Sequence, residues 1–73
     1  MNRPADQHDV ERIARDVLAA GAWDVHLLAI ESIDEAWHVA VTDAAGRVIT
    51  TDIPRGKPAA IRAALSQWLD RQL

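Results

Sequence analysis

The spacing of hydrophobic positions along this chain predicts a helix first. Between residues 7 and 20, apolar side chains recur every three or four positions, which is the period of an amphipathic helix. They are Val10, Ile13, Ala14, Val17 and Leu18. Asp6 is the expected N-cap, because its carboxylate can accept from an otherwise unpaired backbone N–H. Gly21 is expected to end the helix in the left-handed conformation.

From residue 23 to residue 53 the period changes to two, which predicts strands. The ranges 25–32, 36–42 and 47–53 are rich in Val, Ile, Thr and Trp. "IDEA" (33–36) is a tight connection, and "DAAGR" (43–47) has the form of a type I turn closed by a glycine with positive φ. Two hairpins predict a three-stranded antiparallel meander.

The turn lengths predict the register of this sheet. A two-residue loop at Asp34 and Glu35 pairs Ile30 with Val39 and Leu28 with Val41, and a three-residue loop at 44–46 pairs Val41 with Ile49 and Trp37 with Ile53. One face then carries the expected core residues Leu28, Ile30, Trp37, Val39, Val41, Ile49 and Ile53. The other face carries Val25, Leu27, Ala29, Glu31, His38, Ala40, Thr42, Val48, Thr50 and Asp52. A slip of one residue would invert both faces.

Residues 58–72 predict a second helix, with Pro58 in the first turn, where a missing N–H costs nothing. The expected fold class is α+β: a two-layer α-β-β-β-α domain with both helices on one face of the sheet. Residues 1–73 would form one domain, with residues 1–5 as a disordered tail. Trp37 and Trp68 are expected in the core, and Trp23 is expected to cover its edge.

Composition limits what such a domain can do. The chain has 73 residues and no cysteine, so packing or a second copy must stabilise it. Its N-terminal segment has no apolar core of the kind that signal peptides carry, which predicts a cytoplasmic location and no membrane association. The histidines His8, His26 and His38 are expected to point in different directions, with His26 facing inward, so no metal site or other cofactor is expected.

The order of elements also resembles a known family. "GKPAAIRAAL" (56–65) is similar to the second helix of the double-stranded RNA-binding domain, which opens with lysines and continues with alanines. The resemblance implies a matching topology and phosphate contacts through Lys57, with Arg62 one turn inside. It covers the topology of the whole chain, and we use it as a fold analogy.

Positive charge gathers in one part of the sequence. Residues 1–45 carry three arginines and nine acids, whereas residues 46–64 carry four basic residues and one acid. The basic residues Arg47, Arg55, Lys57 and Arg62 are therefore candidates for binding a phosphate or a nucleic acid at the start of the second helix. The alternative is that they are solvated charges around a turn and a helix start.

The predicted outer face carries two further candidates. Glu31, His38 and Asp52 fall in one row, an arrangement that suits a proton transfer or a weak metal site but is also common in surface charge clusters. The second candidate is an apolar interaction face, whose residues are Val25, Leu27, Ala29, Ala40, Thr42, Val48 and Thr50.

The function expected from these features is a small protein-interaction module without catalytic activity. It would self-associate, as a homodimer, through the outer sheet face or a sheet edge, or bind another protein partner. The alternative is a nucleic-acid or phosphate binder that uses the four basic residues. An enzyme that uses His38 with Glu31 and Asp52 ranks last, because no serine is predicted near His38.

Overall fold

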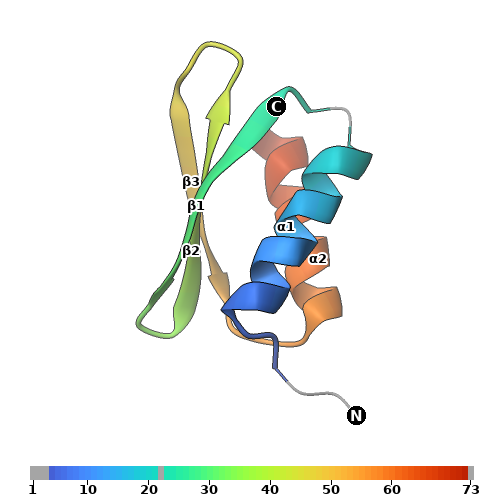
Figure 1. Cartoon of the computed structure of the whole chain (residues 1–73), viewed down its shortest axis with the longest axis vertical. Helices are drawn as coiled ribbons and strands as arrows, with labels where there is room; N and C mark the ends of the chain where they lie inside the picture. The colour runs from blue at the N-terminus through green and yellow to red at the C-terminus, as the bar shows by residue number, and fades with distance from the viewer. Residues whose placement is uncertain (1–3, 22, 73) are drawn as a thin grey trace.

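The computed structural model describes residues 4–21 and 23–72, and its elements follow the predicted order (Figure 1). They are α1 (Gln7–Ala20), β1 (Val25–Ile33), β2 (Ala36–Asp43), β3 (Val48–Pro54) and α2 (Pro58–Gln72). The three strands form an antiparallel sheet in the order β1-β2-β3. Both helices lie on one side of it, α1 against β1 and α2 against β3. The predicted α+β class is confirmed. Within the residues described, neither helix is long and apolar enough to cross a bilayer.

The start of α1 is fixed by reciprocal capping. The Asp6 carboxylate accepts from the Asp9 N–H at 2.9 Å, and the Asp9 carboxylate accepts from the Asp6 N–H at 3.1 Å. The predicted N-cap is confirmed, because two otherwise unpaired donors are satisfied together. Ala5, just before it, is buried, and its N–H donates to the Gly56 carbonyl at 2.9 Å. The structure thus places Ala5 in the packed domain; residues 1–3 of the predicted tail lie outside the described residues.

The end of α1 differs from the prediction. Gly21 has φ −85° and ψ 170°, which is extended backbone, so the predicted left-handed cap is wrong. Glycine is needed there for space. A Cβ on Gly21 would overlap the ring carbons Cε3 and Cζ3 of Trp23, and even Cη2 would lie only 2.7 Å away. The Trp23 ring is half-buried and packs against the edge of the core, as predicted.

Both hairpin turns have the predicted lengths. Asp34, with φ 53°, lies between the paired residues Ile33 and Ala36. Gly46 has φ 83° and donates its N–H to the Asp43 carbonyl at 3.0 Å. A positive φ is unfavourable for most side chains. Glycine has no side chain and Asp tolerates this conformation better than most residues, which explains the residue types at these turns. The predicted pairs Ile30–Val39, Val41–Ile49 and Trp37–Ile53 are confirmed.

A β-bulge changes the register in the first half of β1. The pairing with β2 shifts between Leu27 and Ala29, so Val41 pairs with Leu27. The predicted Leu28–Val41 pair is therefore wrong. An extra residue in one strand inverts the faces of all residues before it, since side chains alternate with period two.

The bulge corrects four assignments to the faces of the sheet. Val25 is 8% exposed and belongs to the core, and Leu27 is half-buried against it, so neither lies on the outer face as predicted. Leu28, predicted in the core, is 56% exposed. His26, predicted to point inward, is exposed.

The core lies between the sheet and the two helices. Both helices and the central strand contribute fully buried side chains, of which the largest are Ile61, Leu69, Val10, Val39 and Val41. Trp37 and Trp68 are 3% and 6% exposed, as predicted for core residues. The buried Trp37 indole N–H has no hydrogen-bond partner in the described part of the chain.

Candidate functional site

The face of the sheet that points away from the helices is open in the part of the chain that the structure describes (Figure 1). We call it the outer face. It comprises His26, Leu28, Ala29, Glu31, Ile33, Ala36, His38, Ala40, Thr42, Val48, Thr50, Asp52 and Pro54. Of the predicted interaction face, Ala29, Ala40, Thr42, Val48 and Thr50 lie on it. Val25 and Leu27 point into the core instead.

Two large apolar side chains stand out on the outer face. Leu28 is 56% exposed and Val48 is 57% exposed. The central strand between them contributes Ala40 and Thr42, which carry no charge. Sequence reasoning missed Leu28, because alternation along β1 gives no signal for the bulge. It also missed Ile33, which is 45% exposed beside the β1–β2 turn.

Glu31, His38 and Asp52 occupy paired positions on the three strands. The His38 Nδ1 lies 2.7 Å from the Asp52 Oδ1, and the two side chains are 33% and 69% exposed. This contact is open to water, which weakens an ion pair. No group of three metal-ligating side chains is found among residues 4–21 and 23–72. Ser32, on the other parity of β1, accepts from the Arg55 guanidinium.

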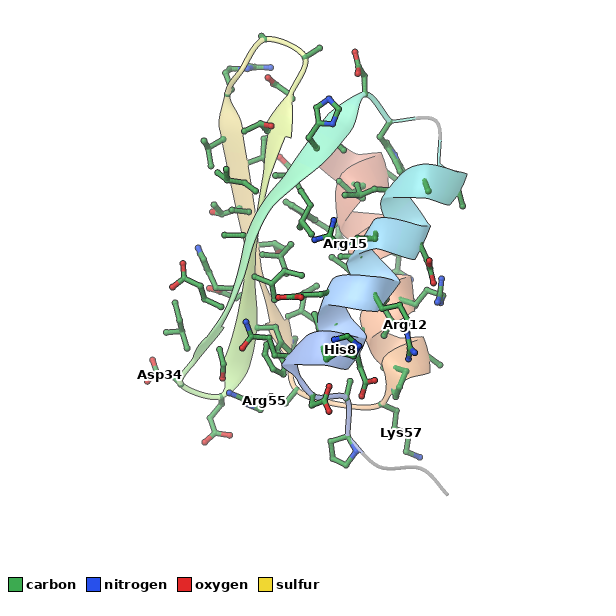
Figure 2. The ribbon with its side chains drawn as sticks, in the orientation of Figure 1. His8, Arg12, Arg15, Asp34, Arg55 and Lys57 are labelled. Atoms are coloured by element: carbon green, nitrogen blue, oxygen red, sulfur yellow. The ribbon has the colours of Figure 1, made fainter. Side chains whose placement is uncertain are left out.

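Arg47 lies in the β2–β3 turn, paired with Asp43. Its backbone N–H and its Nε both donate to the Asp43 carboxylate, at 2.9 Å and 2.8 Å. The hydrogen bond from the Arg47 backbone N–H, helped by the guanidinium, lowers the pKa of Asp43 below its usual value. This turn is at the opposite end of the sheet from the loop that carries Arg55 and Lys57 (Figures 1 and 2). The four predicted basic residues are thus not brought together.

Arg55 and Arg62 also have partners within the molecule. The Arg55 guanidinium lies 4.7 Å from the centroid of the Trp37 ring and donates to Ser32 and to the Asp34 carbonyl. Arg62 approaches Asp16 of α1 at 3.7 Å. Lys57 lies at the same end of the molecule as Arg55 (Figure 2), and its side chain has no ion pair or hydrogen bond within the described residues.

A surface hollow of about 500 Å³ opens between Trp23, Asp70 and the β2–β3 turn. Its walls include Asp24 and Asp43, of which Asp43 is held by Arg47. The hollow is open to solvent and brings no nucleophile or histidine next to these carboxylates in the described part of the chain.

Comparison with known proteins adds no functional evidence. No protein-family model matches the chain, and neither a curated protein nor a solved structure is significantly similar to it. The function is therefore argued from the geometry.

Proposed function

We propose that this chain is a protein-interaction module that self-associates through its sheet and has no catalytic role. The observation that carries the proposal is the outer face: Leu28 and Val48 are each more than half exposed on a sheet face that no described element covers. Exposed apolar side chains that share one face are typical of interaction surfaces.

The size of the domain supports the same proposal. At 8.0 kDa the chain buries only about 60% of its unfolded surface on folding, so its stability is expected to be low for a monomer. It has no cysteine to add a disulfide. A second copy that binds only the folded state would stabilise it by mass action.

The His38–Asp52 contact fits an interaction surface better than an enzyme. Both side chains reach water, and Glu31 stands on the neighbouring strand in the same row. A cross-strand group of this kind stabilises the sheet modestly and can orient a partner through charge. We therefore assign it a polar role at the edge of the apolar area.

Sedimentation equilibrium of the full chain over a wide concentration range tests the proposal. We expect the mass to rise with concentration from 8.0 kDa to twice that value. Thr50→Lys, on the outer face and on an edge strand, should shift the equilibrium to monomer. Ala19→Lys adds the same charge on the exposed side of α1 and should leave it unchanged. A monomer at every concentration would end this proposal.

A further inference from the structure

We propose that the free edge of β3 pairs antiparallel with β3 of a second copy about a two-fold axis, which doubles the three-stranded sheet. This inference rests on the proposed self-association and specifies its surface as the β3 edge, where Val48 of the outer face is one of the paired residues. The axis would run perpendicular to the sheet, so the helices of both copies would lie on the same side.

The hydrogen bonds at the two ends of β3 determine which of its groups point outward. The Asp43 N–H donates to the Arg47 carbonyl at 3.0 Å, and the Arg55 N–H donates to the Glu35 carbonyl at 3.4 Å. In an antiparallel pair the bonding residues alternate, so the odd-numbered residues of β3 bond to β2. Val48, Thr50 and Asp52 therefore direct their backbone N–H and C=O groups away from β2, in the plane of the sheet and toward its free edge.

These outward groups need a partner other than the chain itself. No hydrogen bond to the backbone of Val48, Thr50 or Asp52 is found within the described residues. The β2–β3 pairing runs without a register shift, and β3 contains no lysine or arginine. An edge strand without a bulge or a basic residue is open to pairing with another chain.

The other edge of the sheet is protected. The bulge between Leu27 and Ala29 interrupts β1, and the Gln7 side chain of α1 donates to the Ile30 carbonyl at 3.3 Å. The even-numbered residues of β2 bond to β1, so Val39 does not bond to its pair Ile30. The Ile30 carbonyl therefore points away from β2, toward the free edge of β1. This contrast selects β3 as the edge that pairs.

The sequence of β3 favours one two-fold register, with Thr50 opposite Thr50 of the second copy. Val48 then lies opposite Asp52 of the second copy, so all three outward residues are paired. Pro54, which has no N–H, stays outside the ladder. A register centred on Asp52 would place two carboxylates opposite each other, which is unfavourable.

The surface of α2 leaves room for this arrangement. Arg62 approaches Asp16 of α1, so that side of α2 faces the other helix. At 100° per residue, Ala60 and Gln67 lie nearly opposite Arg62, on the side beyond the β3 edge, with Ala63 next to them. All three are exposed. The middle of this side therefore carries only small or uncharged side chains, which allow α2 of the second copy to approach there. Arg71, which lies opposite Arg62 in the last turn, is exposed and away from this middle part.

Single cysteines test the pairing, since the natural chain has none. In a hydrogen-bonded antiparallel pair the Cα atoms are about 5.5 Å apart, which is within the range of a disulfide. Thr50→Cys should therefore oxidise to a covalent dimer as the main species on a non-reducing gel. Thr42→Cys, on the outer face of the central strand, should stay monomeric.

Mixed variants test the register. Val48→Cys and Asp52→Cys should cross-link when mixed, and each should stay monomeric on its own. In this register each position lies four residues along the strand from the same position of the second copy. Amide exchange on the unmodified chain gives an independent readout: the N–H groups of Val48, Thr50 and Asp52 should be protected at high concentration and lose protection on dilution.

The outcomes separate this inference from the proposed function. Cross-linking of Thr42→Cys but not Thr50→Cys would show face-to-face packing, which overturns edge pairing while self-association stands. An unmodified chain that sediments as a dimer while the amides of Val48, Thr50 and Asp52 stay unprotected would also overturn edge pairing alone. A monomer in sedimentation would remove both.

Discussion

Gly21→Ala should destabilise this protein, although Gly→Ala changes usually stabilise where the backbone permits them. The φ of −85° at Gly21 suits any residue, so the substitution creates no backbone strain. Its methyl group, however, would occupy the space of the Trp23 ring. The ring must then swing away from the edge of the core, where it now packs against buried residues.

The sign of the effect follows from two opposing free energies. Without a clash, alanine would stabilise the fold by about 0.4–1 kcal/mol, because it restricts the unfolded chain. Overpacking costs roughly 1–3 kcal/mol. The net result is a loss of about 1 kcal/mol. This is a measurable share of a total stability that, for 73 residues, is on the order of 4–11 kcal/mol.

Urea denaturation followed by circular dichroism measures this loss, and a double-mutant cycle gives the control. With a slope of roughly 1 kcal/mol per molar urea, the midpoint of Gly21→Ala should fall by about 1 M. In a Trp23→Ala background the clash is gone, so the same change should raise the midpoint. If Gly21→Ala stabilises the protein while Trp23 is present, the reasoning is refuted.

Further predictions concern the turn, the bulge and the basic residues. Hydrogen bonding from Arg47 lowers the pKa of Asp43 in the folded protein. The stabilisation from the ionised Asp43 carboxylate is therefore complete above the unfolded pKa of 3.8, and it is lost as the pH falls through the lower folded pKa. The urea midpoint of Asp43→Asn should therefore lie below that of the unmodified chain at neutral pH, and the gap should close as the pH falls through the folded value. Val25→Ala removes two buried methyl groups and should cost at least ~1.6 kcal/mol in urea denaturation. Leu28→Ala, at an exposed position, should change stability by less than ~0.5 kcal/mol, and equal losses would contradict the bulge. An amide NMR titration with a short RNA duplex at low salt should show no salt-reversible shifts around Lys57; such shifts would favour the anion-binding alternative.

The elements of this fold could be predicted because each is specified by local signals. The helical spacing between residues 7 and 20 and the capping residue Asp6 determine α1. Pro58 marks the start of α2, and Gly46 supplies the positive φ that the second hairpin turn needs. These signals depend on a few neighbouring residues, so they can be recognised without tertiary contacts.

The features that could not be predicted depend on contacts between distant parts of the chain. "VHLLAI" alternates equally well with or without a bulge at Leu28, and packing of Val25 against the helices decides between the two. Gly21 has the composition of a left-handed cap, but the ring of Trp23 determines its role. The basic residues were expected to form one patch because they are close in sequence, yet the β3 strand separates Arg47 from Arg55 by its full length.

The bulge also bears on how two copies could meet. It turns Val25 and Leu27 into the core and exposes Leu28, and it disrupts the ladder on the edge of β1. With Gln7 bound to the Ile30 carbonyl, that edge is a poor template for another strand. β3 has neither device, and its three outward residues face water in the isolated chain. A sheet that protects one edge and leaves the other regular is suited to pairing once and then stopping, because a two-fold axis through β3 uses up the open edge of both copies. This geometry favours a closed dimer over a growing fibre.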